Sequence, residues 1–170
     1  MIHRSHLKGD AASEAVYSDC ETYRYLLTRS WNDTAPRIML IMLNPSTATE
    51  VQNDPTIERC ERRARNLGFG AMRIVNLFAF RATDPRVMKA AADPVGPENN
   101  DLLLHSLTEW RPNMILCGWG AHGAHLGRSD VVAQMLRGRD QILWNLGVTK
   151  AGLPRHPLYI AYDQRPERWT

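Results

Sequence analysis

Apolar positions along the chain form two kinds of segment, and the two kinds alternate. Residues 38–43 are all apolar, which is typical of a central strand buried on both faces. Residues 54–68 repeat apolar positions every three or four residues, which predicts an amphipathic helix with Asp54 as its N-cap and Pro55 in its first turn. The same patterns predict further strands at 72–78, 113–117 and 141–146, and further helices at 98–110 and from Ser129 onward.

This alternation of strands and helices predicts an α/β fold with a mostly parallel sheet. Residues 21–31 are aromatic-rich and roughly alternating, which favours an antiparallel edge strand. We therefore expect a three-layer α/β/α sandwich, with a mostly parallel central sheet of about four strands and an antiparallel N-terminal edge strand. The 170 residues contain no repeat or linker, so residues 1–170 are expected to form a single domain.

Unusual, mostly polar segments lie where the predicted strands end. In an open parallel sheet the ligand crevice lies beyond the carboxyl ends of the strands. We therefore expect these residues to meet at one rim of the sheet. They are Asn44, Pro45 and Ser46 after the first strand, Asn76 and Arg81 at the end of the second, Trp119 after the third and His156 beyond the fourth.

Two of these residues suggest chemistry. The Asn44 carboxamide can orient a water molecule or read the edge of a base, although it is not a strong base. His156 can donate a hydrogen bond to a leaving group that gains negative charge. An ordinary strand-ending turn at Asn44 and a structural role for His156 are the alternatives.

Other motifs are weaker. Gly118, Gly120 and Gly123 match the spacing G-x-G-x-x-G, but they follow the third strand, so close backbone packing is favoured over NAD binding. His122 and His125 lack an obvious third metal ligand. The sequence has neither the G-x-S-x-G motif of acyl-enzyme hydrolases nor a Walker lysine.

Composition narrows the class of protein. Hydrophobic residues make up 44% and charged residues 23%, which is typical of a globular chain. Three cysteines without a C-x-x-C pair favour neither a disulfide framework nor a zinc site. There is no apolar run long enough for a bilayer span and no signal-peptide pattern at the start, so a cytoplasmic location is expected.

The basic residues are strongly biased towards arginine. Of the 21 basic residues only Lys8, Lys89 and Lys150 are lysines, which leaves 18 arginines. Arginine suits phosphate contacts, so the bias is compatible with a nucleic-acid surface, but a GC-rich genome has the same effect. The net charge of +3 does not distinguish the two.

Long strings in the chain resemble one family closely. Over about residues 15–162, the sequence is similar to the bacterial and phage family catalogued as domain of unknown function (DUF) 1643, a resemblance that names no activity. The strings are LNPSTA at 43–48, NDPTIERC at 53–60, VNLFAFRATDP at 75–85, DPVGPEN at 93–99, GWGAHG at 118–123 and TKAGLPRHPLY at 149–159.

A more distant resemblance implies an activity. Four short strings, in order, resemble the strand-end motifs of uracil-DNA glycosylase-like proteins. They are Met42 to Ser46, Val75 to Leu77, Cys117 to Gly120 and His156 to Leu158. The resemblance implies hydrolysis of the N-glycosidic bond of a base, normal or modified, that is extruded from DNA. DNA is then the expected partner, and no metal or cofactor is required.

The same resemblance implies roles for individual residues. Asn44 would position the attacking water, Asn76 would read the base edge and His156 would stabilise the departing base. Leu158 would lie near the loop that wedges into the base stack, and Phe78 or Trp119 would stack on the extruded base. Apart from the resemblance, and above all for a binding module without catalysis, the basic residues expected to contact nucleic acid are Arg59, Arg62, Arg63, Lys150 and Arg155.

Two of the strings differ from the glycosylase motifs that they resemble. The last motif has Leu158 where these proteins usually have serine, and the first lacks the catalytic aspartate of the most active branch. Asp54 is the nearest acid of that type in sequence, but its predicted helix-capping role already accounts for it. Two other functions therefore stay open: a non-catalytic nucleic-acid or nucleotide-binding module, and an enzyme acting on a free nucleoside or nucleotide in the same crevice.

Overall fold

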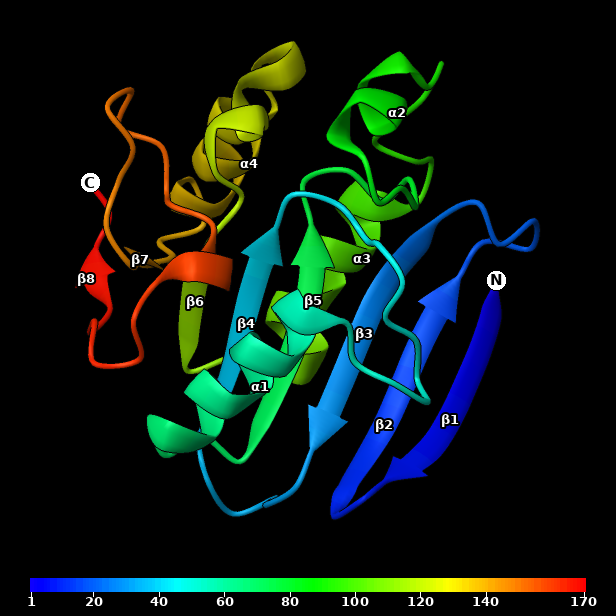
Figure 1. The fold of residues 1–170 in the computed structure, drawn as a ribbon, viewed down its shortest axis with the longest axis vertical. Coiled ribbons are helices and arrows are strands. Elements are labelled where there is room, and N and C mark those ends of the chain that lie inside the picture. The colour runs from blue at the N-terminus through cyan, green and yellow to red at the C-terminus, as the bar shows by residue number, and fades with distance from the viewer.

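The computed structural model describes residues 1–170 and contains one mixed sheet of eight strands, in the order β1-β2-β3-β5-β4-β6-β7-β8 (Figure 1). β5, β4, β6 and β7 are mutually parallel neighbours, whereas every other pairing is antiparallel. The strands are β1 (Ile2–Lys8), β2 (Ala11–Tyr17), β3 (Arg24–Ser30), β4 (Arg37–Met42), β5 (Ala71–Asn76), β6 (Met114–Cys117), β7 (Leu143–Asn145) and β8 (Glu167–Arg168).

The prediction of a mostly parallel sheet is wrong for the sheet as a whole. Four of the seven pairings are antiparallel, because β1 and β2 extend the sheet beyond β3 and β8 adds a strand beside β7. β3, predicted as an edge strand, is therefore an interior strand. β1 and β2 were missed because β1 is mostly polar and the first inward-facing residues of β2, Ala11 and Ser13, are small.

Helices cover both faces of the sheet. The core on one face includes Ile57, Cys60 and Ala64 of α1 (Pro55–Asn66), and the core on the other includes Leu103 of α3 (Asn99–His105) and Val132 of α4 (Arg128–Arg137). In Figure 1, α1 lies in front of β4 and β5, and α3 lies behind them. No helix combines the length and apolar character needed to cross a membrane. The remaining helical segments are α2 (Pro85–Ala90), a π-helical turn (Ser106–Trp110) and 3-10 segments at Ala121–Gly127 and Pro157–Tyr159.

Local sequence signals predict the start of one helix correctly and the start of another only approximately. Asp54 caps α1, since its Oδ1 accepts a hydrogen bond from the Ile57 amide at 2.8 Å, and Pro55 is the first helical residue as predicted. α4 begins earlier than predicted, after Gly127 in a left-handed conformation, and Ser129 is a buried residue inside the helix.

The segment between β4 and α1 crosses the sheet before it enters the helix. It leaves the end of β4, passes over β5 and β3 and returns to α1 (Figure 1). Two buried arginines of β3 hold it there: Arg24 donates to the Ala48 carbonyl, and Arg29 donates to the Thr49 carbonyl and to Asn53 Oδ1. This segment begins with Asn44, so its anchoring helps to fix the predicted site.

Candidate functional site

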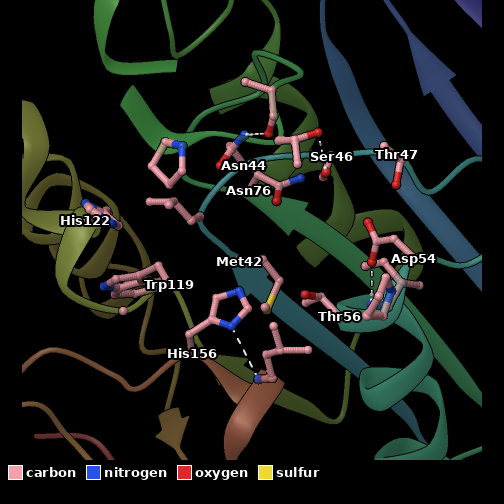
Figure 2. Close-up of a pocket in the computed structure, with 18 of the residues that line it drawn as sticks. Met42, Asn44, Ser46, Thr47, Asp54, Thr56, Asn76, Trp119, His122 and His156 are labelled. Carbon is pink, nitrogen blue, oxygen red and sulfur yellow. Dashed lines mark hydrogen bonds between the residues drawn. The ribbon is translucent and has the colours of Figure 1, made fainter. Parts of the chain in front are cut away.

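A cavity of about 460 Å³ lies beyond the carboxyl ends of β4, β5 and β6. Asn44, Asn76 and His156, which come from three separate parts of the chain, all line it (Figure 2). The volume lies within the range of about 300–1,000 Å³ that is typical of small-molecule sites. Among the other residues selected from the sequence, Ser46, Trp119 and Leu158 also line the cavity.

Asn44 is held in a single orientation by its amide nitrogen. Its Nδ2 donates to the carbonyl oxygens of Ala82 at 2.8 Å and Pro45 at 3.0 Å. Since both amide hydrogens are used in this way, Oδ1 is left as an acceptor that takes no hydrogen bond from the chain. The side chain is therefore preset to accept a hydrogen bond from a water molecule or a ligand.

Asn76 is the last residue of β5 and is only 1% exposed. Its backbone carbonyl accepts a hydrogen bond from Asn99, but its side-chain Nδ2 is buried without any partner. Buried polar groups in folded proteins nearly always have a partner, and leaving one unsatisfied costs about 1–3 kcal/mol. An orphan donor at the wall of a cavity is a natural contact for a ligand.

His156 begins the 3-10 turn Pro157–Tyr159, and its Nδ1 accepts a hydrogen bond from the Leu158 amide at 3.3 Å. A neutral ring that accepts at Nδ1 carries its proton on Nε2. Burial lowers the pKa of His156, and the nearby negative charge of Asp54 only partly opposes that shift. Figure 2 shows the other ring nitrogen pointing towards Met42 and the interior of the cavity. His156 is therefore a neutral donor.

The turn after β6 lies close to the loop that carries His156. A Cβ at Gly118 would lie 3.1 Å from the Pro157 ring, and Gly120 has φ of +71° with its amide donating to the Pro154 carbonyl. These contacts are the close backbone packing predicted for the G-x-G-x-x-G string. Between the two glycines, the buried Trp119 lines the cavity and turns its indole nitrogen away from His156, so the ring presents apolar surface (Figure 2).

Two charged residues of the wall were not selected as site residues from the sequence. Arg24 is buried, and burial lowers its pKa to about 10, so the guanidinium stays charged at neutral pH. Asp54 lies in the same wall, and its two oxygens accept hydrogen bonds from the Ile57 and Ala48 amides. Asp54 was recognised as a helix cap, but no local pattern marks Arg24, because its place depends on how the segment after β4 crosses β3.

Three of the residues expected to bind the substrate do not line the cavity. Pro45 is buried behind it, and its carbonyl accepts from Asn44 and from the Ala82 amide. Phe78 is completely buried and packs against the His125 ring, 5.6 Å between centroids. Arg81 donates to the Glu21 carbonyl and lies over a tyrosine ring. None of the three is in place to contact a ligand in the cavity, so the stacking role considered for Phe78 does not fit its position.

The arginine-rich helix is largely a structural element. Arg63 is 2% exposed and donates to three carbonyl oxygens within residues 160–164, and Arg59 donates to the first of these carbonyls. Arg65 forms an ion pair with Asp10 at 2.7 Å. The expected basic face of this helix is therefore mostly occupied by contacts within the chain.

Three of the basic residues selected for nucleic-acid contacts are exposed. Arg62 lies 3.5 Å from Glu58 on the outer face of α1, and Lys150 and Arg155 lie on the exposed segment before His156. Arg155 is next in sequence to His156. These exposed side chains can be reached by a negatively charged partner, and only Arg62 already has a carboxylate beside it.

A family model described as "Protein of unknown function (DUF1643)" matches residues 24–158. The match covers all the residues that line the cavity and excludes the hairpin of β1 and β2. No curated protein and no solved structure matches the chain.

Proposed function

Because the chain belongs to the DUF1643 family, whose description assigns no activity, we propose a function from its cavity: hydrolysis of the N-glycosidic bond of a nucleobase extruded from DNA. The observation that carries the proposal is the convergence of Asn44, Asn76 and His156 on one cavity of about 460 Å³. These three side chains are an oriented acceptor, an orphan buried donor and a neutral donor.

The chemistry of the bond fits these groups. As the bond breaks, the sugar becomes oxocarbenium-like and the departing base gains negative charge. The Nε2–H of His156 donates to the departing base, and a fixed donor lowers the barrier because it needs no reorganisation at the moment of reaction. Oδ1 of Asn44 accepts from the attacking water and orients it. The water oxygen bonds to C1′ of the sugar as the bond from C1′ to the base breaks, and the proton that the water loses neutralises the departing base. Asn76 donates to the edge of the base.

The wall and the fold support a base as the ligand. Trp119 offers an apolar ring beside His156, on which an extruded base can stack. Leu158 lies at the same wall, and the next residue, Tyr159, is 89% exposed beside the His156 turn. Helices on both faces of the parallel strands are compatible with a three-layer sandwich of the uracil-DNA glycosylase type, and the strand-end motifs follow the order found in that group.

The same chemistry on a free nucleoside or nucleotide is the second candidate. Two arginines of α1 favour this candidate because they are not available for DNA: Arg59 and Arg63 already donate to carbonyl oxygens of the chain. Of the five basic residues selected for DNA contacts, only Arg62, Lys150 and Arg155 are exposed. A free nucleoside needs the cavity but no extended basic surface.

Base release from defined substrates tests the proposal. Single- and double-stranded oligonucleotides carrying uracil, hypoxanthine, mismatched or hypermodified bases are incubated with the protein, and abasic sites are detected by alkaline strand cleavage. We expect cleavage that is lost in Asn44→Ala and His156→Ala and kept in His105→Ala, which changes an exposed histidine outside the cavity. Release from nucleosides but not from DNA selects the second candidate. Absence of release from every substrate overturns both.

A further inference from the structure

Arg24 is the one arginine that lines the cavity, and it is 1% exposed. The only hydrogen bond of its side chain is from Nη1 to the Ala48 carbonyl, and its Nε is buried without a partner. No carboxylate lies within ion-pair distance of the guanidinium, although Asp54 contributes to the electrostatic field around it. The cation is therefore buried with most of its donors unused.

Other buried arginines of the same protein make more side-chain hydrogen bonds, although Nε of Arg29 and of Arg63 also lacks a partner. Arg29, five residues further along β3, reaches the hydroxyl of Ser13, the Thr49 carbonyl and Asn53 Oδ1. Arg63 reaches three carbonyls, and Arg128 reaches the Leu77 carbonyl and Asn100. None of these three lines the cavity. The shortage of acceptors is thus most severe at the arginine that a ligand can reach.

Arg24 is not the only donor in this wall that lacks an acceptor. Nδ2 of Asn76 is buried and unpartnered, and His156 carries a proton on Nε2 because its Nδ1 accepts from the backbone. Each of these three residues therefore has an N–H donor without an acceptor in the chain: Nε of Arg24, Nδ2 of Asn76 and Nε2 of His156. A ligand group that also donates would leave them unsatisfied, whereas an acceptor oxygen would satisfy them.

We propose that Arg24 is a specificity-determining residue, which together with Asn76 and His156 selects ligands that present acceptor oxygens instead of amino groups. This inference rests on the proposed function, because it names the class of base that the cavity takes. The oxygens are the oxo groups of a nucleobase or the oxygens of a phosphate. Asp54 in the same wall makes a doubly charged phosphate less favourable than a neutral oxo base.

Pairs of bases that differ in an exocyclic oxo or amino group, and in the protonation of the neighbouring ring nitrogen, provide the test. Uracil and cytosine differ in an oxo or amino group at position 4, and hypoxanthine and adenine differ in the same way at position 6. We expect each oxo base to bind about 5- to 100-fold more tightly than its amino counterpart, as measured by NMR titration, because the amino group leaves buried donors unpaired. Inorganic phosphate is titrated in parallel, and its binding in place of the bases assigns the acceptor oxygens to a phosphate.

Two variants connect the preference to Arg24. Arg24→Met is expected to remove most of the preference, and Arg24→Lys, which keeps the charge but not the planar fork, is expected to retain part of it. Arg73→Met is the matched control, because Arg73 is a half-buried arginine with a pKa that burial likewise lowers to about 10, and it lies outside this cavity. Thermal melting shows that each variant is folded.

The wild-type titrations need no variant, so they decide the inference even where Arg24→Met does not fold. Equal affinities within both base pairs, failure of all five probes to bind, or a preference unchanged in a folded Arg24→Met overturns it. Binding is measured without turnover. A clear oxo preference without base release therefore refutes the proposed hydrolysis and leaves the role of Arg24 intact. Base release without any oxo preference refutes only the role of Arg24.

Discussion

Replacing Arg63 by methionine tests whether the arginines of α1 hold the fold together or contact a partner. The Arg63 guanidinium donates to the carbonyls of Ile160, Ala161 and Gln164 and lies 5.4 Å from the centre of the Tyr162 ring. These contacts fix the segment that directly follows the His156 turn. Methionine keeps much of the apolar stem of arginine but none of the donors.

The expected loss follows from these contacts. A hydrogen bond to a charged group contributes about 1.5–3 kcal/mol to the free energy of unfolding. The sum over three such bonds is an upper limit for the loss, and it exceeds the loss that most single substitutions cause. Part of the loss is recovered, because the freed carbonyls near the surface can bind water. We expect a loss of about 3 kcal/mol in the free energy of unfolding, which lowers Tm by about 6–12 °C for a chain of this length.

Arg62→Met is the matched control, on the same helix and with the same change of side chain. Arg62 is 60% exposed, and its contact with Glu58 is a single surface pair at 3.5 Å. Such a pair contributes less than about 0.5 kcal/mol. Urea and thermal unfolding of the two variants measure the difference. Equal stabilities, together with an equal loss of DNA affinity in both, would show that Arg63 is a phosphate contact and that the structural role is wrong.

Three further predictions concern the cavity. Burial holds the pKa of His156 below its usual 6.5, so the neutral ring contributes its full stability above pH 6.5, and this contribution is lost as the pH falls through the lowered pKa. His156→Gln should therefore flatten the dependence of Tm on acid pH. An unchanged dependence would contradict the assignment of His156 as a buried neutral ring. Gly120→Ala should lower the free energy of unfolding by about 1–3 kcal/mol and reduce base release, because the φ of +71° and ψ of −169° strain alanine and the new Cβ contacts His156. Gly127→Ala, with nothing within 4 Å of its Cβ, should lower only Tm. Equal activities of the two variants would count against a functional contact between Gly120 and His156. Asn76→Leu should weaken binding of uracil by tenfold or more while Tm stays the same or rises, because the Asn76 side chain makes no hydrogen bond in the chain; a large fall in Tm would show that the residue is structural.

The central part of the fold was predictable because its local signals agree. The apolar run of β4 and the N-cap and proline of α1 each point to the element that forms. β1 and β2 were not predictable in the same way, because their stability comes from pairing with β3 and their own residues are polar or small. β8 has two residues and depends on β7 for its pairing.

The candidate site was predicted through topology more than through motifs. Asn44, Asn76 and Trp119 meet because parallel strands bring their carboxyl ends to one edge. Phe78 lies only two residues beyond Asn76, but it packs into the core behind the cavity, and sequence position alone does not resolve such a difference in direction. Arg24 was missed because it starts an antiparallel strand and enters the wall only through the segment that crosses β3.

Direct detection of the released base is the measurement that decides between catalysis and binding. Mass spectrometry follows free uracil and free hypoxanthine from oligonucleotides and from the corresponding nucleosides, with the wild type, Asn44→Ala, His156→Ala and His105→Ala in parallel. Convergence of Asn44, Asn76 and His156 on a hydrolytic site predicts free base from the wild type and from His105→Ala, and little or none from the two cavity variants. Free base produced equally by all four proteins, or by none of them, would contradict the assignment of this cavity as the site of N-glycosidic hydrolysis.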